Sequence, residues 1–147
     1  MNELKLALTA LCEELGLEPP EADARGRYEV RVEELVLRLG PWGKTEVVLE
    51  GVIGNLGRNA AGAWETQQEV LRQVLTWNIG RLKGQPRPEI LSFDEEENLL
   101  LLWRTWPLDE RLTAAVLQGA EEMLNELEFW RSKILSVAPT FGQEGAS

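Results

Sequence analysis

The triplet Gly43-Lys44-Thr45 is the first place where residue type and spacing suggest chemistry, because Gly-Lys-Thr ends many phosphate-binding loops. That loop needs a glycine five residues before the Gly-Lys pair, and this position is Arg38. It also needs a helix directly after the triplet, so that backbone amides face the phosphate. Residues 45–50 read TEVVLE, which is typical of a strand. The sequence therefore argues against nucleotide binding.

The acidic run of residues 94–98 invites a calcium-loop interpretation. The EF-hand pattern has Asp or Asn at its third position and Gly at its sixth. This chain has Glu96 and Leu99 at these two positions. A charged hairpin turn explains the run better.

The residues that usually catalyse reactions are scarce. The chain has no histidine, so it lacks the usual general base and the commonest metal ligand. The acidic pairs at 13–14 and 121–122 are adjacent in predicted helices, where neighbouring side chains diverge and cannot share a substrate. The single cysteine, Cys12, excludes an intrachain disulfide and lies among apolar helix positions, where it is expected to act as a small hydrophobe. We expect no cofactor, no metal and no enzyme activity, although a carboxylate-dependent hydrolase is left open.

Charge narrows the class of partner. Acidic residues outnumber basic ones by 25 to 15, giving a net charge of −10 and a pI near 4.6. Binding nucleic acid or an anionic membrane requires clustered Lys and Arg, so neither partner is expected. The amino terminus is too acidic for a signal peptide, and no apolar run approaches the roughly 18 residues of a membrane span. We therefore expect a cytoplasmic protein.

The first third of the chain predicts a helix followed by a strand meander. Residues 2–15 repeat leucine at helical spacing, with Gly16 just past the end. The Pro and Gly content of residues 18–26 predicts a loop. Apolar and charged residues then alternate, which predicts strands over 27–32, 35–39 and 45–53. A turn is predicted at 40–43, between the second and third of these strands.

The rest of the chain predicts two helices around a hairpin. A helix is expected over about 65–82, and strands over 89–93 and 99–106. The second of these strands is apolar on both faces, so it should be covered on both sides. A long helix follows over 109–135, with Asp109 or Glu110 favouring its start. The predicted fold is α+β in the order α-β-β-β-α-β-β-α, a single domain over 1–136 with a mobile tail over 137–147.

This order of elements resembles a family, the class I type III secretion chaperones, also called the Tir-chaperone-like family. The family-like features are the opening helix ending Leu15-Gly16-Leu17, the three-strand meander, and a mid-chain helix ending near Trp77-Asn78. A hairpin running into Trp106-Pro107-Leu108 and a last helix with Phe129-Trp130 near its end complete the resemblance. The small size and the acidic pI also fit.

The resemblance implies a bacterial cytoplasmic homodimer that binds the N-terminal segment of a secreted effector in extended form and keeps it ready for export. It implies no cofactor. The effector is expected to contact apolar grooves on the first helix and last strand, and it could also add a strand to the sheet edge. The predicted effector-binding residues are Leu6, Leu100, Leu102 and Trp106, and the predicted dimer contacts are Val70, Val74 and Trp77. A regulatory protein of the same fold, which sequesters a cytoplasmic secretion or transcription regulator, is the alternative.

Overall fold

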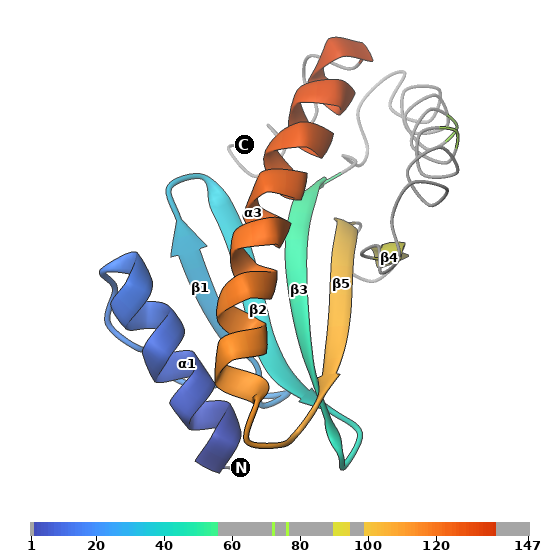
Figure 1. The fold of residues 1–147 in the computed structure, drawn as a ribbon. Coiled ribbons are helices and arrows are strands. Elements are labelled where there is room, and N and C mark those ends of the chain that lie inside the picture. Colours follow the sequence, from blue (N-terminus) through green and yellow to red (C-terminus); the bar gives the residue numbers. More distant parts are fainter. Residues whose placement is uncertain (1, 56–71, 73–75, 77–89, 95–98, 138–147) are drawn as a thin grey trace.

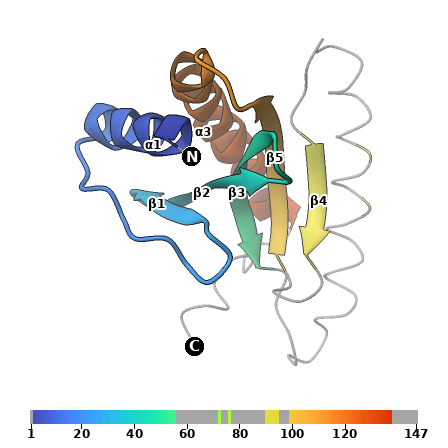
Figure 2. The same cartoon turned by 90° about the horizontal axis from the view of Figure 1, so that it is seen from below.

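The computed structural model describes residues 2–55, 72, 76, 90–94 and 99–137 of the 147-residue chain. Two long helices, α1 (Asn2–Leu15) and α3 (Leu112–Val137), lie on the same face of an antiparallel sheet (Figures 1 and 2). The five strands pair in the order β1-β2-β3-β5-β4. Their bounds are β1 (Tyr28–Val32), β2 (Leu35–Trp42), β3 (Glu46–Asn55), β4 (Ile90–Asp94) and β5 (Leu99–Pro107). The predicted α+β class is confirmed.

The order of the described elements is α-β-β-β-β-β-α. The helix predicted over 65–82 lies outside the described residues except for Arg72 and Thr76, which are both helical. The Thr76 hydroxyl donates a hydrogen bond of 2.9 Å to the Arg72 carbonyl, one helical turn earlier. The tail predicted over 137–147 also lies outside them, apart from Val137 at the end of α3.

The first helix follows its sequence pattern. Leu4, Leu8 and Leu11 are buried on one stripe, which packs on α3 more than on the sheet. The helix ends at Gly16, whose φ of 72° is the left-handed conformation that glycine tolerates without strain. The backbone N–H of Leu17 then donates to the Cys12 carbonyl at 2.8 Å, which satisfies one of the free carbonyls at the helix end.

The meander places alternate side chains against the helices. Its buried inward residues are Val30, Leu37, Leu39, Val47 and Leu49. The turn predicted at 40–43 is wrong, because β2 continues through Pro41 to Trp42 and the chain turns after it, where Gly43 has a φ of 66°. Proline is tolerated at this point of β2 because β1 pairs with β2 only as far as Leu39, so no partner on that side needs its N–H.

The last helix covers the middle of the sheet. The helix buries an apolar stripe at helical spacing: Leu112, Val116, Ala120, Met123, Leu127 and Trp130. The helix starts three residues later than predicted because Asp109 lies outside it, with its carboxylate accepting a 2.9 Å bond from the Arg111 N–H. The helix comes close to β3 at Gly51, where an added Cβ would lie 2.9 Å from atoms of both Leu127 and Met123. A larger residue at this point would require the ends of the Leu127 and Met123 side chains to shift.

Candidate partner-binding site

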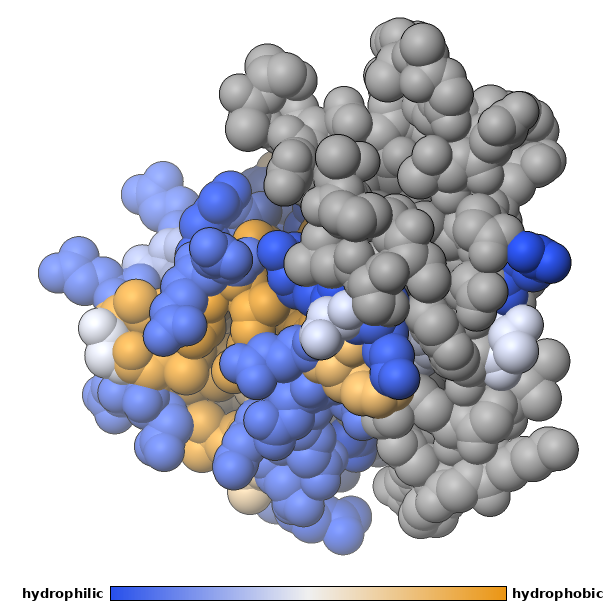
Figure 3. Space-filling model, turned by 90° about the horizontal axis from the view of Figure 1, so that it is seen from above, coloured by the Kyte–Doolittle hydropathy of each residue, from blue (hydrophilic) through white to orange (hydrophobic). Residues whose placement is uncertain are grey.

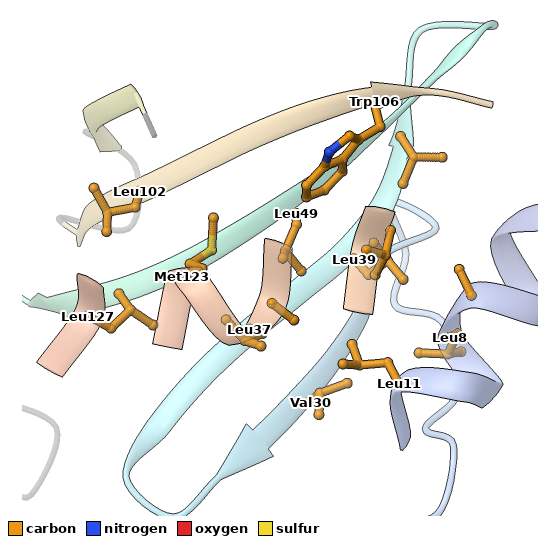
Figure 4. Close-up of a cluster of buried hydrophobic side chains, with 14 of the residues drawn as sticks. Leu8, Leu11, Val30, Leu37, Leu39, Leu49, Leu102, Trp106, Met123 and Leu127 are labelled. Carbon is orange, nitrogen blue, oxygen red and sulfur yellow. The ribbon is translucent and has the colours of Figure 1, made fainter. Parts of the chain in front are cut away.

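The structure buries two of the predicted effector-binding residues. Leu100 and Leu102 are each 1% exposed and belong to the core cluster. Figure 4 shows Leu102 directed toward Met123 and Leu127 of α3. Within one subunit, α3 covers this face of β5. A partner can reach these two side chains only if α3 moves.

Trp106 is also largely buried, at 9% exposure, and α3 holds it in place. An added Cβ on Gly119 would lie 2.3 Å from Cζ2 of Trp106, so the indole lies directly against the α3 backbone. The Arg104 guanidinium is 5.2 Å from the indole centroid and bonds to Glu122 of α3 at 2.7 Å. The exposed edge of Trp106 lines a pocket of about 330 Å³ together with Pro107, Asp109, Arg111, Leu112 and Ala115.

Leu6 is the most exposed large apolar residue in the described part of the chain, at 63% exposure. It lies on the outer side of α1, opposite the buried stripe. Its predicted contact with a partner stays a prediction. The predicted dimer contacts Val70, Val74 and Trp77 lie outside the described residues.

A group of apolar residues that the sequence did not single out lies around the C-terminal end of α1 and the β1–β2 turn. We call it the open end and define it as Leu15, Leu17, Val32 and Leu35. Leu17 is 38% exposed, and the other three are half-buried against the core. Figure 3 views this end of the molecule and shows apolar surface bordered by hydrophilic residues. These residues come from two separate segments, so no local pattern predicts that they meet.

The open end adjoins an unpaired sheet edge. In the order β1-β2-β3-β5-β4, β1 pairs with β2 on one side and with no strand of the described residues on the other. In an antiparallel pair, every second residue directs its N–H and C=O away from the partner strand. Apolar and charged side chains also alternate along β1, with Val30 and Val32 on the helix side and Glu29 and Arg31 on the other. The edge can therefore bind an extended chain through its backbone.

The opposite face of the sheet carries charged and aromatic contacts. Arg27 passes over Gly40, where an added Cβ would lie 2.7 Å from its Cγ, and reaches Glu50 on β3 with a 2.6 Å bond. Trp42 and Trp103 contact each other further along this face, with ring centroids 5.4 Å apart and ring planes tilted by 35°. Trp42 is 49% exposed. No described helix covers this face (Figure 2).

Among the described residues, Asp23 and Cys12 have a clearly shifted pKa, and both groups are structural. Backbone N–H groups of Arg27 and Arg25 donate to the Asp23 carboxylate at 2.9 and 2.8 Å and lower the pKa of that carboxyl. Burial raises the pKa of the Cys12 thiol, so the reactive thiolate is disfavoured. Neither group lies beside a second catalytic partner.

The described residues hold no group of three or more metal-ligating side chains. Among the described helices, none has both the length and the apolar character needed to cross a membrane. What the described surface does offer is an apolar area next to a free strand edge.

Comparisons with known proteins agree with this description. Three solved structures share the fold: a chain of the HopA1–SchA chaperone–effector complex, a chain of the ExsC–ExsE complex, and a chain of the ExoT–SpcS complex from Pseudomonas aeruginosa. The first is 18% identical, covers 90% of this chain and 97% of that one, and has a TM-score of 0.59. The second is 16% identical with coverages of 89% and 92% and a TM-score of 0.64. The third is 19% identical with coverages of 87% and 97% and a TM-score of 0.53.

No curated protein gives a match to this chain. A protein-family model matches residues 7–131, which include most of α1, all five strands and most of α3. The chain belongs to the Tir chaperone protein (CesT) family, and it is a type III secretion chaperone rather than an enzyme.

Proposed function

We propose that this chaperone binds the N-terminal region of a secreted effector as an extended strand along β1, with apolar effector side chains seated on the open end. The observation that carries the proposal is the unpaired edge of β1 directly beside uncovered apolar surface. A chain with the same fold comes from a chaperone–effector complex, that of HopA1 and SchA. A client held in this way stays unfolded and ready for export.

Strand addition divides recognition between backbone and side chains. Main-chain hydrogen bonds to β1 supply affinity for any extended segment, whereas pockets for alternate side chains set the register. A strand added at β1 would direct every second side chain to the helix side, beside Val30, Val32 and the rest of the open end. The client side chains between them would lie beside Glu29 and Arg31. Leu6 and the exposed edge of Trp106 remain further candidate contacts for more distant parts of the client.

A proline substitution tests the backbone contact. The two-residue turn 33–34 makes Val32 and Leu35 a hydrogen-bonded pair, so the N–H of Val32 points toward β2. Because successive N–H groups of a strand point to opposite sides, the N–H of Arg31 points to the free edge. Arg31→Pro removes this N–H without removing a bond between β1 and β2. The matched control Arg31→Ala keeps the N–H and loses only the same exposed side chain.

The client is first identified as the exported protein that co-purifies with the chaperone from its native cell. We expect Arg31→Pro to weaken binding of this client by about tenfold or more, because one main-chain hydrogen bond is lost and the hydrogen bonds next to it are displaced. Arg31→Ala should bind almost normally. Equal binding by both folded variants would refute strand addition at β1. A co-purifying cytoplasmic regulator that is not exported would favour the regulatory alternative.

We also propose a homodimer in the bacterial cytoplasm, with Val70, Val74 and Trp77 at the dimer contact. The support is the apolar character of residues 65–82 in the sequence and the preference of homo-oligomers for two-fold symmetry. Light scattering should give the mass of a dimer at micromolar concentration. Val74→Asp should give a folded monomer, and a monomeric wild-type protein would contradict the proposal.

A further inference from the structure

The open end is bordered by carboxylates without ion-pair partners in the described part of the chain. Glu14 lies at the end of α1, Glu18 follows it, and Glu33 lies in the β1–β2 turn. All three are exposed. The neighbouring Glu34 has a side chain that is 89% exposed, and its carboxylate lies 3.9 Å from the Arg131 guanidinium, at the long end of the ion-pair range. Figure 3 shows hydrophilic residues on the border of the apolar surface at this end.

The nearby cations are already engaged. Arg31 and Arg38 both pair with Glu29, at 3.2 and 3.8 Å. Arg27 pairs with Glu50 at 2.6 Å on the opposite face of the sheet. The net charge at the open end is therefore negative. These carboxylates lie beside apolar surface and do not form a group that could bind a metal ion.

Only local charges decide what binds at this end under physiological conditions. At an ionic strength near 0.15 M, charges are screened over about 8 Å. Glu46 and Glu110 lie at the other end of the sheet and of α3, far from the β1–β2 turn (Figure 1). The overall charge of −10 therefore acts weakly at the open end, whereas Glu14, Glu18 and Glu33 act directly.

We infer that the client segment seated at the open end carries Lys or Arg beside its aliphatic residues, and that the site selects such segments over neutral or acidic ones. The inference rests on the proposed function. The aliphatic side chains lose water against the open end, and the basic groups reach the carboxylates at its border. Complementary charge of this kind also speeds association and disfavours acidic segments, which would meet like charge at the border.

Three short synthetic peptides test the inference with the full chain. In each peptide, the side chains that face the open end alternate between valine and the test residue, which is lysine, serine or glutamate, and serine occupies the positions between them on the other face. We expect the lysine peptide to bind about tenfold more tightly than the serine peptide at physiological ionic strength, from several partly exposed ion pairs. The glutamate peptide should bind most weakly. Fluorescence anisotropy of labelled peptides measures all three affinities.

Charge-neutral variants locate the effect. In a triple variant with Glu14→Gln, Glu18→Gln and Glu33→Gln, the advantage of the lysine peptide over the serine peptide should fall to about twofold or less. The control triple variant has Glu46→Gln, Glu110→Gln and Glu121→Gln, the same change in net charge, and should keep the full advantage. Equal loss in both triple variants would assign the effect to net charge and overturn the inference.

The failure of this inference is distinguishable from the failure of the proposed function. Equal binding of the lysine and serine peptides, both lost in Leu17→Asp, would overturn the charge selectivity and leave the apolar open end as the binding site. Absence of binding by all three peptides would also overturn the inference. The proposed function is then judged independently, by the effect of Arg31→Pro on the co-purified client.

Discussion

The contact between Trp106 and Gly119 determines whether the substitution Gly119→Ala stabilises or destabilises the protein. In an ordinary exposed helix, Gly→Ala stabilises by about 1 kcal/mol, because alanine loses less conformational entropy on folding. Here the new methyl group would lie 2.3 Å from Cζ2 and 2.7 Å from Cη2 of Trp106. The indole cannot move freely, since the Arg104 guanidinium lies 5.2 Å from its centroid on β5. Overpacking of this kind costs about 3 kcal/mol at the upper end of its usual range.

We therefore expect Gly119→Ala to destabilise the protein by about 2 kcal/mol, and to lower Tm by roughly 4–8 °C for a domain of this size. Trp106→Phe removes the part of the ring that meets the new methyl group. In that background, Gly119→Ala should become neutral or stabilising. Urea unfolding followed by far-ultraviolet circular dichroism measures all four proteins of the cycle. A stabilising effect of Gly119→Ala in the wild-type background, or the same loss in both backgrounds, would refute the reasoning.

Three further predictions follow from the buried contacts. Leu102→Asp should unfold the subunit rather than only abolish client binding, because it buries an unpaired charge under α3; circular dichroism that shows a folded variant would contradict this. Arg131→Met should lower the free energy of unfolding by about 1–2 kcal/mol in urea titrations, because it removes the 2.9 Å bond to the Ile53 carbonyl. The lowered pKa of Asp23 means that its contribution to stability is complete above the unfolded-chain pKa of about 3.9 and disappears as pH falls through the lower folded-state pKa. The urea midpoints of wild type and Asp23→Ala should thus differ at pH 7 and converge in strong acid, and a difference that persists there would exclude this origin.

Local periodicity explains what the sequence could predict of this fold. The leucine spacing of α1 and the apolar stripe of α3 each depend on residues one or two turns apart, and both helices are confirmed. The alternation of Tyr28, Val30 and Val32 likewise predicts which face of β1 is buried. The turn predicted at Pro41 was wrong because proline is typical of turns, and the sequence does not show that β1 ends before Pro41 and needs no hydrogen bond from it.

The candidate site depended on contacts that no local pattern contains. The sequence shows that β5 is apolar on both faces, and it does not show that α3 lies over Leu100 and Leu102. The open end combines residues from the end of α1 and from strands on either side of the β1–β2 turn, two segments that are separate in the sequence. Gly119 was one available signal for the Trp106 contact, since a glycine inside a helix costs about 1 kcal/mol relative to alanine.

The packing of α1 on α3 constrains how this protein can be made. The ribosome releases α1 well before α3, yet the leucine stripe of α1 finds most of its cover on that last helix. Pairing of β3 with β5 likewise waits for a distant part of the chain. The growing polypeptide therefore exposes an amphipathic helix and an incomplete sheet until α3 has emerged, and native folding begins late in synthesis. The nascent chaperone is therefore prone to aggregation before α3 is synthesised. Co-translational pairing with a second nascent copy or with the client would bury the same leucines.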